Sequence, residues 1–228
     1  VSSKKRKKAW AEFQRTSVYT AAELVSKGDA DIFLSPGNTG GTVLAAKSAI
    51  GKLRLYPRAR PPIITTIPQE DKYSILVDSG ANPECSHFDL AYFAIAGSIF
   101  YSFLYGKEQP SVGVVNMGTE DYKGRKTVRD AVNLLKETHL KDRVYFVEGG
   151  AAVNGDEDVV VCDGFLGNAL LKAYESTARV VKSATKKGMN SKLTSRIAAG
   201  YLKAKGAFDI VKNLSEKANS GGFMIGLN

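Results

Sequence analysis

Four segments of the chain combine glycine with short polar residues, which is the composition of an anion-binding loop. They are Ser35–Gly41, Asp78–Asn82, Asn116–Glu120 and Cys162–Asn168. Glycine leaves backbone N–H groups open, and the asparagine, serine, threonine or aspartate beside it adds polar groups that can reach a ligand. One such loop is often only a structural turn. Four of them, each with an asparagine, indicate a ligand site for an anion.

The first of these segments, Ser35–Gly41, lies between a predicted strand and a predicted helix. Backbone donors and the positive end of a helix favour phosphate at such a place. No Gly-Lys-Ser/Thr closes the segment, so it is not a Walker A loop, and its glycine spacing differs from the GxGxxG dinucleotide fingerprint. The loop therefore predicts a phosphate site without either nucleotide signature.

The sequence contains no pattern for covalent or metal catalysis. There is no GxSxG elbow, and the two histidines, His87 and His139, stand in polar surroundings typical of a surface. Of the two cysteines, Cys85 and Cys162, the second follows a valine run and resembles a small buried hydrophobe more than a nucleophile. No CxxC or Cys/His cluster occurs, so we expect no metal, no cofactor and no disulfide, with reduced thiols in a cytoplasm.

The elements that must position these loops are predicted from apolar periodicity and turn residues. The predicted helices span residues 8–27, 42–53, 90–105, 127–138 and 168–183. The predicted strands span residues 30–35, 63–67, 73–77, 111–116, 144–147 and 159–162.

The strands are short continuous apolar runs, which are typical of a sheet covered on both faces. Alternating strands and helices then predict an α/β fold with a mostly parallel, Rossmann-like sheet and helices on both faces. In such sheets ligands bind beyond the carboxyl ends of the strands. Each of the four glycine-containing segments follows a predicted strand, so we expect them to surround one crevice.

Eight segments resemble, in the same order, those of the bacterial phosphate acyltransferases of phospholipid synthesis, the PlsX family. They are SPGNTGG (35–41), Arg60-Pro61, VDSGAN (77–82), GSIFYSFLYG (97–106), VGVVNMGTEDYKG (112–124), VEG (147–149), DVVVCDGFLGNALLKAYE (158–175) and GGFMIGLN (221–228). The resemblance covers nearly the whole chain. It implies an isocitrate-dehydrogenase-like fold and transfer of a fatty acyl group from acyl carrier protein to inorganic phosphate, giving acyl phosphate for phosphatidic acid synthesis.

The implied reaction needs no covalent enzyme intermediate, because phosphate attacks the thioester carbonyl and the carrier thiolate leaves. Orientation and fixed hydrogen-bond donors then supply most of the rate. The expected phosphate ligands are Ser35, Asn38, Thr39 and Gly40. The expected catalytic residues, which offset charge or position the thioester and its oxyanion, are Lys123, Asp78, Asn82, Asn116, Asp163 and Asn168. As alternatives, Asp78 and Asp163 act in capping or turn hydrogen bonds, and Lys123 is an ordinary exposed lysine.

The chain departs from the family pattern at several positions. Arg125 and Lys126 stand where the family usually has an asparagine and an acid, and Gly150-Ala151 replaces a usual Arg-Asp. Family members also begin with a further strand and a glycine-rich aspartate motif, and they continue beyond the equivalent of Asn228. We therefore expect either a fragment or a divergent member, and we carry no family role over to these positions.

The net charge of +9 is concentrated in two segments. Residues 4–8 are basic, and residues 179–217 hold ten basic and two acidic side chains, which gives +8. We expect an α/β core over residues 1–178, a basic amphipathic helical hairpin over 179–218 and a return to the core over 219–228. The expected contacts with the acidic carrier protein or an anionic membrane are Lys182, Lys186, Lys187, Arg196 and Lys203. As an alternative, the hairpin is solvated and packs on a dimer partner.

The resemblance also implies a homodimer that meets the membrane surface and hands its product to the next acyltransferase. No run approaches the length of about 18 to 20 apolar residues that a membrane span requires, so we expect a cytoplasmic protein, peripheral at the inner face of the membrane. Three other functions remain open: a phosphotransacetylase-like enzyme that uses coenzyme A, a nucleic-acid-binding module and a non-catalytic scaffold. We expect no nucleic-acid partner, because no aromatic platform or recognition helix accompanies the lysines.

Overall fold

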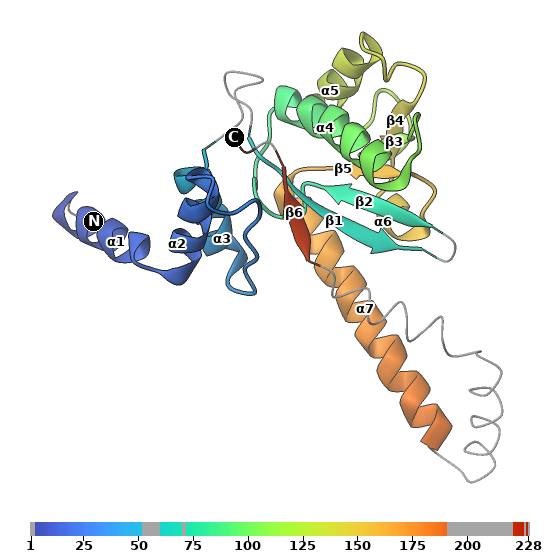
Figure 1. The fold of residues 1–228 in the computed structure, drawn as a ribbon. Helices are drawn as coiled ribbons and strands as arrows, with labels where there is room; N and C mark the ends of the chain where they lie inside the picture. The colour runs from blue at the N-terminus through green and yellow to red at the C-terminus, as the bar shows by residue number, and fades with distance from the viewer. Residues whose placement is uncertain (1–2, 52–59, 70–71, 191–220, 226, 228) are drawn as a thin grey trace. The chain divides into compact units, whose positions relative to one another are not determined.

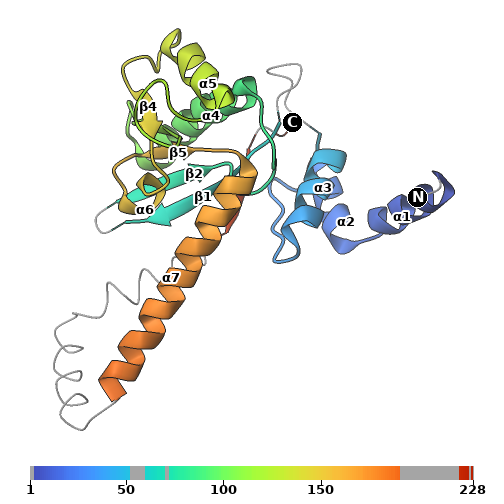
Figure 2. The same ribbon diagram turned by 180° about the vertical axis from the view of Figure 1, so that it is seen from behind.

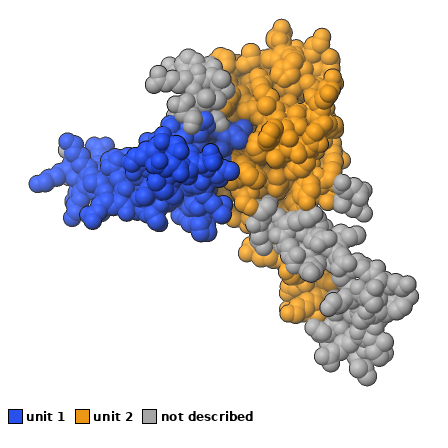
Figure 3. All heavy atoms as spheres, viewed as in Figure 1, with its two compact units in different colours: residues 1–62, 224–228 blue, residues 63–223 orange. Residues whose placement is uncertain are grey.

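The computed structural model describes residues 3–51, 60–69, 72–190, 221–225 and 227 of the 228-residue chain. The chain forms two compact units, unit 1 with residues 1–62 and 224–228 and unit 2 with residues 63–223 (Figure 3). Most of the predicted basic hairpin lies outside the described residues, so the division into residues 1–178, 179–218 and 219–228 stays a prediction.

The described part of unit 1 contains the helices α1 (Ser3–Gln14), α2 (Ser17–Ser26) and α3 (Thr39–Ala49) (Figure 1). The single helix predicted over residues 8–27 is wrong, because Thr16 starts a new helix by accepting a hydrogen bond from the N–H of Tyr19 at 3.4 Å. The rings of Trp10, Phe13 and Tyr19 pack across the break with centroids 5.6 to 6.0 Å apart. Apolar spacing thus continues through the break, which is why periodicity did not reveal it.

The strand predicted over residues 30–35 is also wrong. The segment carries no strand assignment, and the side chains of Ile32 and Leu34 are 83% and 92% exposed. A strand exists only when a neighbour pairs with its backbone, and the described residues supply no such neighbour here. The helix after it starts at Thr39, three residues earlier than predicted, because the Asn38 side chain caps it.

Unit 2 is built on the sheet that gives the chain its fold class. The strands are β1 (Ile63–Pro68), β2 (Tyr73–Val77), β3 (Val112–Val115), β4 (Val144–Val147), β5 (Val159–Val161) and β6 (Gly222–Met224). Their order is β4-β3-β5-β2-β1-β6. The pairs β2–β5, β5–β3 and β3–β4 are parallel, and β1–β2 is antiparallel. The predicted mostly parallel sheet is confirmed.

Helices cover both faces of this sheet (Figures 1 and 2). They are α4 (His87–Tyr105), α5 (Lys126–Lys136), α6 (Ala151–Asn154) and α7 (Gly164–Asn190). On one face Leu76 and Val160 belong to a cluster against which Leu170 of α7 packs. On the other face Gly97 of α4 lies so close to Val159 that an added Cβ would sit 2.9 Å from it. Burial on two sides is why these strands are continuous apolar runs.

Capping residues set both ends of helix α4. Ser86 and Asp89 form a capping box at its start, and Gly106 ends it in the left-handed conformation. The helix is long and apolar enough to cross a membrane by length and composition, so the expectation that no such segment exists was wrong. Its residues Phe93 and Ala94 are fully buried in unit 2, and the core helix of a soluble protein passes the same test.

The amino ends of the strands are held by the buried carboxylate of Asp158. It accepts hydrogen bonds from Lys107 Nζ at 2.6 Å and from Ser111 N at 2.7 Å, and Lys72 Nζ lies 3.6 Å away. Burial by itself would raise the pKa of Asp158, but the hydrogen bonds from Lys107 and Ser111 outweigh it and the pKa is lowered. The amino ends of the strands lie opposite their carboxyl ends, where ligands bind in such sheets, so we assign Asp158 a role in stability.

Candidate active site

Three of the four predicted loops gather at the carboxyl edge of the sheet in unit 2. Asp78 directly follows β2, Asn116 follows β3, and Asp163 comes two residues after β5. Since β5 lies between β2 and β3 and all three run parallel, their ends meet at one edge. The structure therefore places these residues where a doubly wound sheet binds ligands.

The carboxylate of Asp78 is fully buried and organises the turn after β2. Its Oδ1 accepts hydrogen bonds from the backbone N–H groups of Ile63 (2.9 Å), Gly80 (3.1 Å) and Ala81 (2.9 Å). Its Oδ2 accepts from the backbone N of Asn82 at 2.7 Å and from the Asn82 side chain at 2.8 Å. Five donors surround the two oxygens, so Asp78 and Asn82 shape the loop, in agreement with the turn alternative.

The first turn of α7 is docked directly on the turn that Asp78 holds. Gly164 N donates to the Asn82 carbonyl at 2.8 Å. At Gly167 an added Cβ would lie 1.9 Å from the Asp78 carbonyl oxygen, so only glycine fits at this position. Asn168 follows on the same turn, with its side chain exposed beside Gly80. Among the described residues the Asn168 amide makes no hydrogen bond, which leaves it available to a ligand.

Asp163 combines a capping role with an ion pair. Its Oδ1 accepts a hydrogen bond from the N–H of Leu166 at 2.9 Å, in the first turn of α7. Its Oδ2 accepts from Arg125 Nη2 at 2.5 Å. The capping alternative therefore holds for Asp163, and its partner Arg125, which had no predicted role, also lies at the candidate site. Its position directly after the Lys-Gly pair of the third loop was the signal that could have found it.

Asn116 braces the loop that carries Lys123. Its side-chain amide donates to the Lys123 carbonyl at 3.0 Å. Gly124, with φ 76°, lies against Asn116 so closely that an added Cβ would be 1.5 Å from its Oδ1. The Lys123 ammonium is 2.5 Å from Glu120 Oε1, and both side chains are partly exposed. The hydrogen bond from Lys123 lowers the pKa of Glu120. The exposed-lysine alternative for Lys123 thus fits the structure, with Glu120 as its partner.

Neither cysteine is suited to nucleophilic chemistry. Burial, followed by the charges of Asp89, Asp78 and Asp163, raises the pKa of the Cys85 thiol to about 12. Burial also raises the pKa of Cys162 well above its ordinary value. Both thiols are protonated at neutral pH, which agrees with the expectation of a reaction without a covalent enzyme intermediate.

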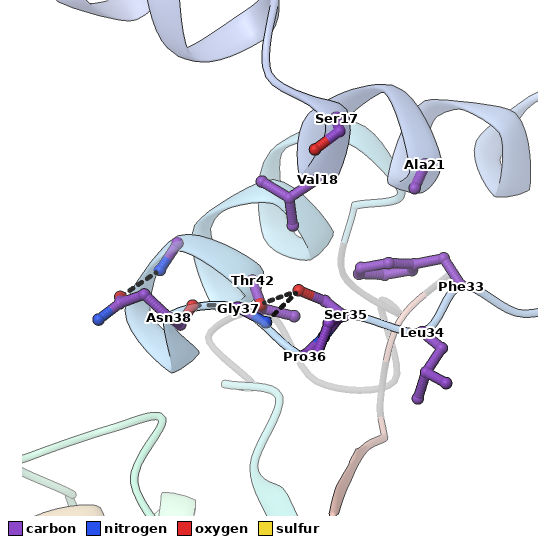
Figure 4. A pocket seen from close by; sticks show the side chains of 11 residues that line it. Ser17, Val18, Ala21, Phe33, Leu34, Ser35, Pro36, Gly37, Asn38 and Thr42 are labelled. Carbon is purple, nitrogen blue, oxygen red and sulfur yellow. Dashed lines mark hydrogen bonds between the residues drawn. The ribbon is translucent and has the colours of Figure 1, made fainter.

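The predicted phosphate ligands lie together in unit 1, in the loop before α3 (Figure 4). Ser35 Oγ accepts hydrogen bonds from Gly37 N at 3.3 Å and from Thr42 Oγ1 at 2.9 Å, which ties the loop to the helix. Asn38 Oδ1 accepts from Gly41 N at 3.0 Å, so this side chain is a helix cap. Thr39 and Gly40 form the exposed first turn of α3.

A pocket of about 490 Å³ opens beside this loop, between it and α2. Val18 and Ala21 line it from the helix, and Phe33 and Pro36 line it from the loop (Figure 4). The pocket, like the loop, belongs to unit 1.

The remaining predicted residues concern the basic segment. Lys182, Lys186 and Lys187 are exposed on α7, whereas Arg196 and Lys203 lie outside the described residues. Within the part of the chain that the structure describes, no group of three His, Cys, Asp or Glu side chains could hold a metal ion.

Comparison with solved structures defines the class of fold. A phosphotransacetylase from Streptococcus pyogenes superposes with a TM-score of 0.58 at 18% identity, over 74% of this chain and 57% of that chain. The EutD phosphotransacetylase from Staphylococcus aureus gives 0.51 at 22% identity, over 70% and 55%. The chain thus has the α/β fold found in phosphotransacetylases.

Comparison of sequences gives the family. Residues 1–228 match the model of the family described as fatty acid synthesis protein, and the chain belongs to this family. It is 36% identical to the phosphate acyltransferase of Paramagnetospirillum magneticum over 218 residues, which cover 94% of this chain and 61% of the relative. It is 38% identical to that of Helicobacter hepaticus over 216 residues, which cover 94% and 63%. The chain therefore spans less than two thirds of the length of these curated relatives.

Proposed function

We propose that the chain transfers a fatty acyl group from an acyl carrier protein thioester to inorganic phosphate, for use in phosphatidic acid synthesis. The observation that carries the proposal is the match to phosphate acyltransferases along the chain, which includes the loops after β2, β3 and β5. The protonated thiols of Cys85 and Cys162 support a direct transfer.

The proposed reaction has one bond formed and one broken. A phosphate oxygen adds to the carbonyl carbon of the thioester, and the carbonyl oxygen takes the negative charge in the tetrahedral intermediate. The carbon–sulfur bond then breaks, and its electron pair leaves on the sulfur of the carrier. The enzyme has to orient both reactants and stabilise the oxyanion with fixed donors.

The side chains of unit 2 divide into positioning and donor roles in this reaction. Asp78 and Asn82 fix the turn after β2, and Asn116 fixes the loop after β3. Asn168 is exposed beside that turn and has no hydrogen bond among the described residues, so we assign its amide to the oxyanion. Ser35, Asn38, Thr39 and Gly40 remain the proposed phosphate ligands in unit 1, with backbone N–H groups of α3 as the donors.

The proposed acyl donor is acyl carrier protein, because it is acidic and α7 presents exposed lysines. Lys182 and Lys186 are four residues apart on this helix, and Lys187 adjoins them. Lys186→Glu should raise the KM for the acyl carrier protein and leave the KM for phosphate unchanged. Lys141→Glu, at an exposed lysine elsewhere in unit 2, is the matched control.

Self-association and location are proposals of the same kind. The chain forms a homodimer, lies in the cytoplasm at the inner face of the membrane and passes its acyl phosphate to a downstream acyltransferase. Light scattering and flotation with anionic vesicles measure these properties, and a monomer that stays with the soluble fraction would contradict them.

The function is tested by measuring free thiol released from palmitoyl acyl carrier protein, with and without phosphate. Release that requires phosphate supports the proposal, and no release with either sample contradicts it for this chain. Acyl-coenzyme A is run in parallel, since the phosphotransacetylase-like alternative predicts that the coenzyme A thioester is the better donor.

A further inference from the structure

The ion pair between Arg125 and Asp163 ties two neighbouring strand ends together. Arg125 ends the loop after β3, and Asp163 follows β5, which is the strand paired with β3. Arg125 Nη2 lies 2.5 Å from Asp163 Oδ2. The guanidinium is therefore held at the carboxyl edge of the sheet, within the same unit as the Asp78 turn and Asn168.

The two partners of this pair differ in their exposure. The Asp163 side chain is 7% exposed and that of Arg125 is 61% exposed. The other oxygen of Asp163 accepts from the N–H of Leu166, so the carboxylate is fixed at both oxygens. This acceptor holds the guanidinium through one nitrogen, Nη2, and the other N–H groups of Arg125 have no hydrogen-bond partner among the described residues. Such a fork suits the paired oxygens of a phosphate.

The neighbouring cations lack this arrangement. Lys123 pairs with Glu120, and Lys126 pairs with Asp130. In each pair the acid lies three or four residues from the lysine, and both side chains are partly or largely exposed. Pairs of this kind on the surface hold a side chain only weakly. Within the described part of the chain, Arg125 is the cation at this edge that a buried carboxylate positions.

We propose that Arg125 binds the phosphate group of the substrate and that Asp163 acts as the positioning residue that holds its guanidinium. This inference deepens the proposed function and rests on it for the identity of the phosphate as a substrate. It places that phosphate in unit 2, as an alternative to the loop of Ser35, Asn38, Thr39 and Gly40 in unit 1.

The first experiment measures binding of inorganic phosphate to the full chain by calorimetry, at constant ionic strength set with chloride. The proteins are the wild type, Arg125→Ala, Arg125→Lys and Asp163→Asn. A charge-assisted hydrogen bond is worth roughly tenfold to a hundredfold in affinity, so Arg125→Ala should weaken phosphate binding by that factor. Arg125→Lys should restore part of it, because the charge remains and the fork is lost.

Asp163→Asn separates the two roles of the carboxylate. Asparagine still caps α7 through its oxygen, so the fold is retained, but it no longer fixes the guanidinium by charge. We expect weaker phosphate binding and, because the ion pair with Arg125 is lost, an unfolding midpoint lowered about as far as in Arg125→Ala. Lys126→Ala is the matched control, because it removes one positive charge from the adjacent residue, which pairs with Asp130 on its own helix. Its phosphate affinity should equal that of the wild type.

The second experiment measures turnover, so that the inference and the proposed function fail separately. In the thiol-release assay Arg125→Ala should raise the KM for phosphate and leave the KM for the acyl carrier protein unchanged. Phosphate binding that is lost in Arg125→Ala supports the inference even where no protein turns over, and the absence of turnover then counts against the proposed function alone. Equal phosphate binding by wild type, Arg125→Ala and Lys126→Ala, or no binding by the wild type, would overturn the inference.

Discussion

Asp78→Asn replaces one carboxylate oxygen by an NH2 group at a position where both oxygens accept hydrogen bonds. Oδ1 accepts three and Oδ2 accepts two, all from N–H donors. Whichever oxygen is replaced, at least two hydrogen bonds are lost and the new NH2 group faces donors. Hydrogen bonds to a charged group contribute about 1.5–3 kcal/mol each, so the variant should lose about 3–6 kcal/mol of unfolding free energy.

The assay is urea unfolding followed by circular dichroism, with amide hydrogen exchange at Gly80, Ala81 and Asn82. A domain has roughly 5–15 kcal/mol of stability in total, so the unfolding midpoint of Asp78→Asn should fall steeply. Exchange at the three amides should accelerate even if the rest of the sheet stays folded. The control is Asp121→Asn, because the Asp121 side chain is 80% exposed and lies 3.8 Å from Lys136. Its effect should stay below about 0.5 kcal/mol.

The result that refutes the reasoning is an Asp78→Asn protein within about 1 kcal/mol of the wild type, with unchanged exchange at the three amides. The five hydrogen bonds would then not hold the turn, and Asp78 would again be a candidate for direct chemistry. A large loss in Asp121→Asn would show instead that any added amide destabilises this chain.

Three further predictions concern the opposite edge of the sheet, the thiols and the oxyanion. Asp158→Asn should cost roughly 1–3 kcal/mol at pH 7, since Asp158 loses its charge beside Lys107. The pKa of Asp158 is lowered on folding, so this stabilisation is present above the unfolded pKa of about 3.9 and is lost as the pH falls through the folded pKa. Urea titrations of both proteins at pH 7 and pH 3 test it, and a constant difference between them would contradict it. The pKa of Cys85 is about 12 instead of 9.0, so its thiolate is about a thousandfold scarcer at neutral pH. Iodoacetamide should therefore label Cys85 and Cys162 only after unfolding. Fast labelling of the native chain, measured by mass spectrometry, would contradict this prediction. Asn168→Ala should lower kcat about 100-fold or more with little change in either KM, as expected for a lost oxyanion donor, whereas a wild-type kcat would remove Asn168 from that role.

The sheet was predictable from the sequence because its strands are buried on both faces. Val159–Val161 and Val144–Val147 were located within one residue, since continuous β-branched runs are a local signature of such strands. The segment 30–35 has the same apolar signature and was predicted wrongly, because a strand is defined by a partner that lies elsewhere in the chain. Helices α3 and α7 start at Thr39 and Gly164, three and four residues before the predicted starts, because the caps Asn38 and Asp163 begin each helix ahead of its apolar periodicity.

The candidate site was predictable as a location but not as a set of roles. The loops after β2, β3 and β5 follow from strand ends alone. Whether a polar side chain is already hydrogen-bonded within the protein or is available to a ligand depends on partners far away in the sequence. Asp78 accepts from the N–H of Ile63, 15 residues away, and Asp163 accepts from Arg125, 38 residues away. No local pattern contains these distances, so the pairing of Arg125 with Asp163 could not be recognised before the structure.

The occupied carboxylates also limit how the proposed reaction can proceed. Both oxygens of Asp78 are taken by N–H donors, and each oxygen of Asp163 has a partner, one of them a cation. A general base needs a lone pair turned toward the proton that it removes. Phosphate is already an anion at neutral pH and can attack without losing a proton to the enzyme. The catalytic requirement at this edge of the sheet is therefore to hold the anion beside the carbonyl and to stabilise the oxyanion. In the proposed reaction Arg125 holds the anion and Asn168 stabilises the oxyanion, and the buried acids Asp78 and Asp163 remove no proton.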